Sequence, residues 1–181
     1  NQSNEKDSFC NEPYVFLISR PSNNKYLPYD RKKKTIQEIK RLVINDLRMK
    51  IIVKLHPRET DGKLFDEIFG SENYGTKWKY SNEHVFNIGE KAEFAICFHS
   101  GVAVDMLALG VPVIECLDLR GLYKKNDKDI FFDQSGDPIM SFRYYGLVLG
   151  ANDYNDMKKY VQKIIENRDL VIQKLTSRYR E

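Results

Sequence analysis

The sequence contains little cysteine, with three residues at positions 10, 97 and 116 of a 181-residue chain. So few thiols exclude a disulfide framework as the main source of stability. A chain of this length does not need one, because it buries roughly 70% of its unfolded surface on folding. Cys97 and Cys116 lie inside apolar runs, so we expect both to be buried, in a reducing compartment such as the cytoplasm.

Long hydrophobic runs and an excess of one charge are also missing. No apolar stretch approaches the roughly 20 residues that cross a bilayer, and no signal-peptide pattern opens the chain. The 29 lysines and arginines nearly balance the 26 aspartates and glutamates, which gives a net charge of +3. A dedicated nucleic-acid-binding protein normally carries a strongly basic stripe. We therefore expect a soluble protein with no nucleic-acid partner.

Two glycine-rich nucleotide motifs are absent as well. The chain has neither a P-loop nor a Gly-x-Gly-x-x-Gly sequence. Hydrolysis of nucleoside triphosphates and dinucleotide redox chemistry therefore lack support. The chain also begins without methionine, in a polar segment, and we expect it to be part of a longer protein.

What the sequence does contain is an alternation of short apolar runs and amphipathic segments. Runs of strand-forming residues predict strands at 14–18, 51–55, 85–88, 94–98, 113–116 and 147–149. Apolar residues at helical spacing predict helices near 36–47, 63–69, 102–109 and 157–165, the last one broken near Asn167 and continued over 170–175. Residues 1–12 lack periodicity, so we expect a disordered leader followed by one domain over 13–181.

This alternation predicts an α/β fold, a doubly wound, Rossmann-like parallel sheet with right-handed crossovers. The strands are apolar on both faces, as strands covered by helices on two sides are. Ligands of such sheets bind beyond the carboxyl ends of the strands. The candidate binding residues at these ends are Arg20, His56, Pro57, the segment 87–90, the motif His99-Ser100-Gly101, and Glu115.

The His99-Ser100-Gly101 motif joins the clearest predicted strand to a helix. Ser100 is placed as the helix N-cap, and Gly101 lacks the side chain that would keep a ligand away from the backbone. With the free amides of Val102 and Ala103, they predict an anion site whose ligand is a phosphate. The alternative is an ordinary capped helix, since serine is among the best N-caps anywhere.

The second candidate, His56-Pro57, places a titratable ring at the same edge, where Pro57 forces the chain to leave the sheet. An imidazole there can donate to a leaving phosphate or neutralise its charge, and a purely structural histidine is the alternative. His56 and His99 together suggest zinc, but no third ligand has suitable spacing, so we expect no metal. Arg20 can hold a diphosphate bidentately or be a solvated loop arginine.

Residues 117–145 form a long segment of charges, aromatic residues and turn formers without a clear period. Loops of this length are uncommon unless they are functional or mobile. Lys124, Lys125 and Lys128 can reach a polyanionic substrate or simply be solvated. The aromatic cluster 142–145 can stack on a base or sugar, cover an edge, or meet another domain.

Three stretches together resemble a known group of enzymes. They are KLHPRE at 54–59, FHSGVAVD at 98–105 and LGVPVIE at 109–115. This pattern resembles the nucleotide-binding half of GT-B glycosyltransferases of bacterial surface polysaccharides. The polysialyltransferases, capsule Kdo transferases and teichoic-acid glycerophosphotransferases of this group share a His-Pro motif and a later serine motif before a Gly-x-Pro turn.

The resemblance implies a function for individual residues. It places His56, Ser100 and Gly101 on the phosphate of a nucleotide-activated donor, such as a CMP-linked sugar, with His56 stabilising the departing phosphate. Asp105 stands near the position of a glutamate that holds the ribose in many GT-B enzymes, and His99 and Val102 belong to the serine motif. No cofactor and no obligatory metal are implied.

The resemblance also implies partners. GT-B enzymes carry the acceptor site on a separate N-terminal domain, so we expect a missing acceptor-binding domain and a glycan or glycolipid acceptor. The full protein is then expected in the cytoplasm, in peripheral contact with the inner face of the membrane. Two alternatives remain, a domain of a non-hydrolysing UDP-sugar 2-epimerase and a non-catalytic interaction module of a polysaccharide-assembly protein.

Overall fold

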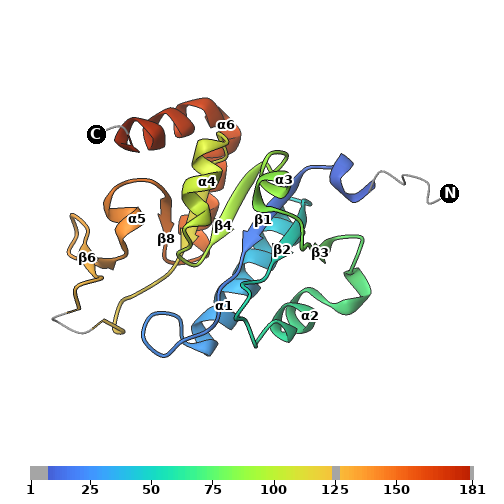
Figure 1. Cartoon of the computed structure of the whole chain (residues 1–181), viewed down its shortest axis with the longest axis horizontal. Helices are drawn as coiled ribbons and strands as arrows, with labels where there is room; N and C mark the ends of the chain where they lie inside the picture. The colour runs from blue at the N-terminus through green and yellow to red at the C-terminus, as the bar shows by residue number, and fades with distance from the viewer. Residues whose placement is uncertain (1–7, 124–126, 180–181) are drawn as a thin grey trace.

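A computed structural model describes residues 8–123 and 127–179 and shows a six-stranded parallel sheet (Figure 1). The strands are β1 (Tyr14–Ile18), β2 (Lys50–Lys54), β3 (Trp78–Tyr80), β4 (Phe94–Cys97), β5 (Val113–Cys116) and β8 (Leu149–Ala151). Their order across the sheet is β3-β2-β1-β4-β5-β8. This is a strand order of doubly wound parallel sheets, so the predicted fold class is confirmed.

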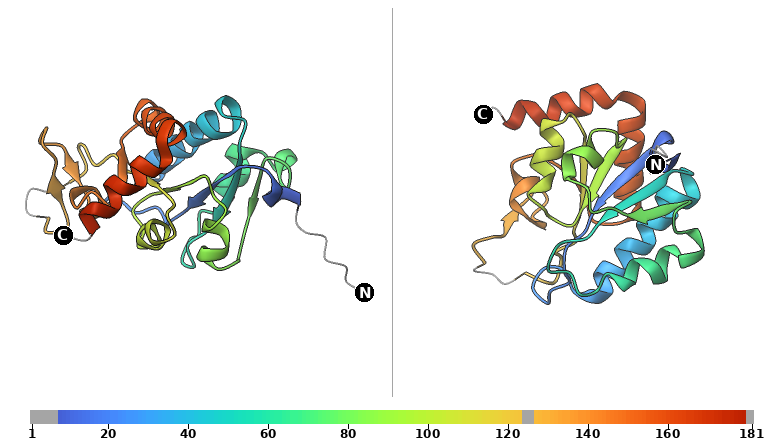
Figure 2. Two further views of the ribbon diagram at one scale, coloured as in Figure 1. Left: turned by 90° about the horizontal axis from the view of Figure 1, so that it is seen from above. Right: turned by 45° about the vertical axis from the view of Figure 1, so that its right-hand side comes forward.

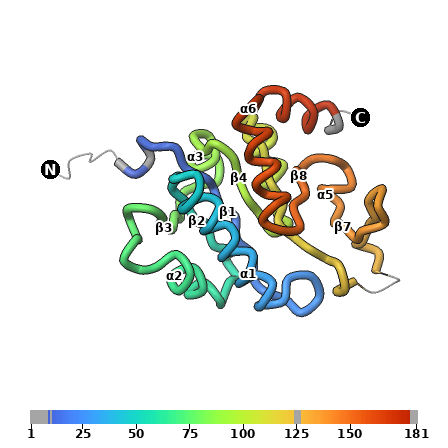
Figure 3. The backbone as a smooth tube through the Cα atoms, turned by 180° about the vertical axis from the view of Figure 1, so that it is seen from behind, coloured from blue at the N-terminus to red at the C-terminus, as the bar shows by residue number. Residues whose placement is uncertain are grey.

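Helices cover both faces of this sheet, as the views in Figures 2 and 3 show. One face carries α1 (Tyr29–Ile39), the π-helical segment η2 (Lys40–Asp46), α2 (Lys63–Phe69) and the first part of α6 (Tyr154–Tyr179). The other face carries the 3-10 helix η1 (Ser8–Asn11), α3 (Val85–Gly89) and α4 (Val102–Ala108). The remaining elements are η3 (Ser71–Asn73), the small strands β6 (Phe131–Phe132) and β7 (Pro138–Ile139), and α5 (Ser141–Tyr144).

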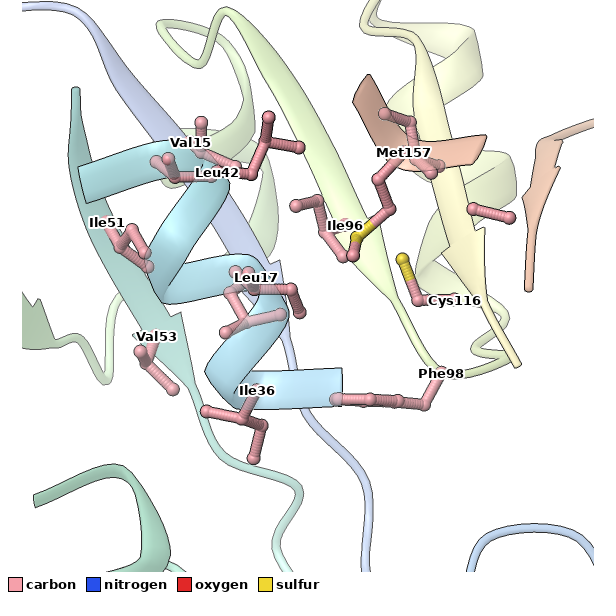
Figure 4. Close-up of a cluster of buried hydrophobic side chains, with 14 of the residues drawn as sticks. Val15, Leu17, Ile36, Leu42, Ile51, Val53, Ile96, Phe98, Cys116 and Met157 are labelled. Atoms are coloured by element: carbon pink, nitrogen blue, oxygen red, sulfur yellow. The ribbon is translucent and has the colours of Figure 1, made fainter. Parts of the chain in front are cut away.

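The hydrophobic core is split by the sheet into two layers. Along β1, Val15 and Leu17 point to the layer of α1 and α6, while Phe16 and Ile18 point to the layer of α3 and α4. Figure 4 shows the first layer, in which Met157 of α6 reaches the same cluster as the strands. Both faces of the central strands β1, β4 and β5 are therefore buried, which explains their continuous apolar runs in the sequence.

The third strand differs from the prediction. Residues 85–88 belong to helix α3, because His84 caps it by accepting a hydrogen bond from the amide of Phe86. The strand is β3 instead, where Trp78 is fully buried and pairs with Ile51 of β2. Charged Lys79 interrupts the apolar pattern of this three-residue strand, so the sequence pattern does not predict a strand there.

The two ends of the domain also differ in detail from the prediction. Order begins before Tyr14, because η1 places Phe9 in the core of the α3 and α4 layer; residues 1–7 lie outside the described residues. The last strand is β8 at Leu149–Ala151 and not 147–149. The predicted break in the terminal helix is confirmed at Asn167, whose φ of −159° and ψ of 81° are not helical.

The long segment 117–145 has more structure than its composition indicates. Phe131 and Phe132 pair in antiparallel fashion with Ile139 and Pro138, and α5 follows directly. Lys124 and Lys125 lie outside the described residues, whereas Lys128 is exposed. None of the helices within the described part of the chain is long and apolar enough to cross a bilayer.

The two core cysteines lead to a first prediction. Burial, with a smaller contribution from Glu115, raises the pKa of the Cys97 thiol to about 12, and burial raises that of Cys116 well above its ordinary value. The reactive thiolate is therefore scarce at pH 8. A Cys10→Ser variant, which retains only these two thiols, should react with a thiol reagent at pH 8 only after unfolding in guanidinium. Rapid labelling of the native variant would contradict this.

Candidate functional site

A cleft lies at the carboxyl edge of the sheet, where β1 and β4 are neighbours and the strand order reverses direction. Its volume is about 530 Å³. The loops that follow β1, β2 and β4 line it with Arg20, Pro21, Ser22, Asn23, Lys25, Tyr26, His56, Arg58, His99, Ser100 and Gly101. Of the predicted candidates, Arg20, His56 and the turn 99–101 come together here, whereas the segment 87–90 does not line the cleft.

Arg20 uses its guanidinium to hold the neighbouring loop. Its Nη1 donates to the backbone carbonyl of His99 at 3.0 Å and lies 3.5 Å from that of Phe98. These contacts fix the turn after β4 relative to the end of β1. Arg20 thus lines the cleft and shapes it at the same time.

His56 is exposed at the end of β2, and its ring is oriented by its own loop. The Nδ1 atom accepts a hydrogen bond from the backbone amide of Arg58 at 3.1 Å. In the neutral ring the proton therefore sits on Nε2, which is a hydrogen-bond donor. Pro57 turns the chain but does not line the cleft, whereas Arg58, two residues after His56, does.

A buried ion cluster holds the His56 loop in place. Lys32 of α1 is completely buried, with Nζ 2.5 Å from Oε1 of Glu59 and 3.0 Å from Oδ1 of Asp61. The other oxygen of Glu59 accepts the backbone amide of His56 at 3.1 Å, and Oε1 also accepts the hydroxyl of Ser19 at 2.6 Å. One lysine thus connects α1 to the loops after β1 and β2.

Asp61 extends this cluster towards the cleft. It accepts a hydrogen bond from the hydroxyl of Ser22, which lines the cleft. Burial opposes ionisation of Asp61, but the hydrogen bonds from Ser22 and Lys32 outweigh it and lower the pKa of this carboxyl. The cluster therefore contains two carboxylates around one ammonium group.

His99 occupies an unusual backbone conformation at the end of β4. Its φ of 79° is in the left-handed region, which residues other than glycine rarely adopt. Its Nδ1 lies 2.8 Å from Oε2 of Glu115, and its ring packs on Phe142 with a centroid distance of 4.7 Å. The surroundings hold this conformation, as is common for strained residues at functional sites.

Glu115 reaches the cleft only through His99. Its side chain on β5 is 0% exposed, so it does not line the cleft as a direct ligand. The Nε of Arg143 lies 3.0 Å from Oε1 of Glu115 as an ion pair without hydrogen-bond geometry. Arg143 also donates to the carbonyls of Glu115 and Ala151 and to the side chain of Asn152.

The Ser100 turn differs from the predicted amide cradle. Helix α4 begins at Val102, with Gly101 at the N-cap position. The hydroxyl of Ser100 accepts the amide of Val102 at 3.3 Å, and its carbonyl accepts the amide of Ala103 at 3.0 Å. The two amides predicted to be free are therefore used within the turn, because a tight turn precedes the helix.

What the turn offers a ligand is its outer surface. Ser100 and Gly101 line the cleft, and a Cβ atom at Gly101 would meet nothing within 4 Å. A ligand can therefore approach the backbone closely at this position. Val102 and Asp105 do not line the cleft.

The aromatic cluster 142–145 is divided between two tasks. Phe142 packs on His99, whereas Tyr144 and Tyr145 lie near Phe131, with Tyr144 stacked at a centroid distance of 4.5 Å. Both tyrosines are more than half exposed. Phe142 thus supports a residue that lines the cleft, whereas Tyr144 and Tyr145 form an exposed aromatic surface near Phe131.

The cleft is cationic. Its lining includes Arg20, Lys25, Arg58 and two imidazoles, and no carboxylate among the described residues. Lys25, which the sequence analysis did not single out, pairs with Asp127 at 2.9 Å and Asp129 at 3.5 Å. Among the described residues, no group of three His, Cys, Asp or Glu side chains is placed to hold a metal ion. This lining favours an anionic ligand.

Sequence comparisons find no matching family model and no matching curated protein. Solved structures do match. A putative UDP-N-acetylglucosamine 2-epimerase from Listeria monocytogenes is 12% identical, with a TM-score of 0.59 over 97% of this chain and 42% of that one. The wall teichoic acid polymerase TagF is 14% identical, with a TM-score of 0.58 over 98% of this chain and 43% of that one.

A third structure matches at domain level. The C-terminal CMP-Kdo binding domain of WaaA from Acinetobacter baumannii is 12% identical, with a TM-score of 0.54 over 97% of this chain and 92% of that domain. This chain therefore spans less than half of the epimerase and polymerase chains and nearly all of the isolated domain. It has the fold of one half of the two-domain GT-B proteins.

The buried ion cluster leads to a second prediction. Replacing Lys32 with Met leaves Glu59 and Asp61 as buried carboxylates without their cation, so stability should fall by about 3–5 kcal/mol. Urea unfolding measures this loss. The matched control is Lys34→Met on the same helix. Lys34 is exposed and makes a weak ion pair with Glu38 at 3.8 Å, so this substitution should lower the free energy of unfolding by less than about 0.5 kcal/mol. If Lys32→Met lowers the free energy of unfolding no more than Lys34→Met does, the buried cluster does not stabilise the fold.

Proposed function

We propose that this chain is the donor-binding domain of a GT-B glycosyltransferase that transfers a sugar from a nucleotide-activated donor in surface polysaccharide biosynthesis. The observation that carries the proposal is the cationic cleft at the strand-order reversal, where His56 and the His99-Ser100 turn meet. The similarity to the CMP-Kdo binding domain of WaaA supports it, since that domain covers the same part of the fold.

In the proposed mechanism the cleft stabilises the departing nucleotide. An acceptor hydroxyl oxygen forms a bond to the anomeric carbon of the sugar and gives its proton to a base. The bond between that carbon and the phosphate oxygen breaks, and its electron pair stays on the phosphate. The Nε2–H of His56 donates to that phosphate, while Arg20 and the Ser100 hydroxyl bind its other oxygens. Because side chains supply this positive charge, we propose that no metal ion is obligatory. Asp105, which does not line the cleft, has no part in this mechanism.

The rest of the reaction is assigned to partners. A second domain supplies the acceptor site and the catalytic base, and the acceptor is a glycan or glycolipid. The whole protein then works in the cytoplasm, at the inner face of the membrane. In support of a second domain, this chain covers only 43% of the Staphylococcus aureus MnaA structure and 43% of the TagF structure.

A UDP-sugar 2-epimerase is the second candidate function. Several of the matching structures are such epimerases, including one from Neisseria meningitidis bound to UDP-GlcNAc, 14% identical with a TM-score of 0.55 over 93% of this chain and 40% of that one. The same cleft would then hold a UDP-sugar. The full-length protein distinguishes the two functions, because an epimerase converts UDP-GlcNAc without any acceptor.

Nucleotide binding provides the third prediction. Calorimetric titration of the chain with CMP, CDP, UMP, UDP and GDP should identify one preferred base. His56→Ala and Ser100→Ala should each weaken binding of that nucleotide about 10-fold or more, since a hydrogen bond to a charged group contributes about 1.5–3 kcal/mol. His84→Ala is the matched control, because His84 caps α3 and does not line the cleft. Binding that both cleft variants leave unchanged would refute the assigned site.

A further inference from the structure

Three neighbouring side chains contact His99 and fix both its ring and its backbone. Glu115 binds its Nδ1, Phe142 covers one face of its ring, and Arg20 binds its backbone carbonyl. Together these contacts keep the residue at a φ of 79°. A left-handed histidine costs free energy, so the fold fixes the ring in one orientation at the expense of backbone strain.

Glu115 also fixes the position of the ring proton. Its carboxylate is fully buried and lies against the guanidinium of Arg143, so it is an acceptor of hydrogen bonds. The Nδ1 of His99 must then carry a proton and donate it over 2.8 Å. In the neutral ring, the remaining nitrogen, Nε2, has only a lone pair to offer.

The two histidines of the cleft therefore have opposite hydrogen-bonding character. The Nδ1 of His56 accepts the amide of Arg58, so its Nε2 is a donor. The Nδ1 of His99 donates, so its Nε2 is an acceptor. A phosphate oxygen accepts hydrogen bonds and cannot donate one when fully ionised. It can bind His56 directly, but it can bind Nε2 of His99 only after that ring has gained a proton.

One buried carboxylate and several basic side chains surround His99. Behind the ring lies Glu115, which is paired with Arg143. The charged and titratable side chains that line the same cleft are Arg20, Lys25 and Tyr26 after β1, and His56 and Arg58 after β2. Glu115 is the only carboxylate in this set of described residues, and Arg143 already offsets its charge. A bound phosphate would add a second anion beside the ring, and a nearby anion favours the charged form of an imidazole.

We propose that His99 takes up a proton from solvent when a phosphate group binds, and that Glu115 is the positioning residue that makes this possible. This inference rests on the proposed function. In the bound state Nδ1–H stays on Glu115, and Nε2–H donates to a phosphate oxygen. The ring then lies between two anions and returns its proton to solvent when the phosphate leaves. Donor binding is thereby coupled to pH through a single side chain.

Proton uptake can be counted by calorimetry. UDP, CMP and inorganic pyrophosphate are titrated at pH 8, where a free imidazole is neutral, in Tris and in HEPES, whose ionisation enthalpies differ. The wild-type chain should take up about 0.5–1 proton per phosphate ligand bound. Glu115→Gln and His99→Gln should each lower this number at least twofold, whereas His84→Gln, the third histidine, should not change it. Unchanged uptake in both cleft variants would overturn the proposal.

A measurement without ligand separates this inference from the proposed function. The imidazole nitrogen shifts in NMR report the tautomer of each ring, and His99 should carry its proton on Nδ1 and His56 on Nε2. His99 with its proton on Nε2 would overturn the proposal, even if nucleotides bind.

Absence of binding by all three ligands would overturn the proposed function and the proton uptake together, while the tautomers would still show whether Glu115 orients His99. Because Glu115→Gln can unfold a buried site, His99→Gln, at a partly exposed position, gives an independent test.

Discussion

The cleft depends on one buried ammonium group. Lys32 comes from a helix on the face of the sheet, yet its Nζ ends among carboxylates that belong to the loop after β2. A charge in this position is costly unless it is fully paired, so the lysine and both carboxylates must be brought together whenever the domain folds. Through Glu59 and Ser19 this requirement extends to the ends of β1 and β2. The loops that carry Arg20 and His56 are therefore fixed by the fold and need no ligand to arrange them.

A second buried cluster has the same role on the other side of the cleft. Glu115 and Arg143 lie behind the end of β4 and hold His99 from below, much as Glu59 holds the loop of His56. In both places a buried carboxylate stands between a cation and a histidine segment. Five of the eleven residues that line the cleft are basic, whereas Glu59 and Glu115, which hold the two histidine segments, have fully buried side chains. This separation gives a cationic cleft in a chain whose net charge is only +3.

Much of this arrangement could be predicted from the sequence. Buried parallel strands are continuous apolar runs, and the position of a ligand at their carboxyl ends follows from topology, so Arg20, His56 and His99 were found together. Short β3 was missed because only Trp78 marks it strongly, and α3 was taken for a strand because four residues cannot show a helical period. The prediction that the amides of Val102 and Ala103 are free was wrong, because both donate to Ser100. The turn that allows this depends on backbone angles that composition does not specify. The ion clusters were missed because their members are distant in sequence and become partners only in three dimensions.

Helix α6 joins the two layers of the domain. Before Asn167 it covers the α1 face of the sheet through Met157, Val161 and Ile164. Directly after the break, Arg168 reaches the backbone carbonyls of Ala92 and Gly110, near the helices of the opposite face (Figure 1). A single non-helical residue thus lets one helix wrap around the edge of the sheet. Arg168 thereby ties the part of α6 after the break to the segments that precede β4 and β5, at the amino ends of these strands and away from the cleft.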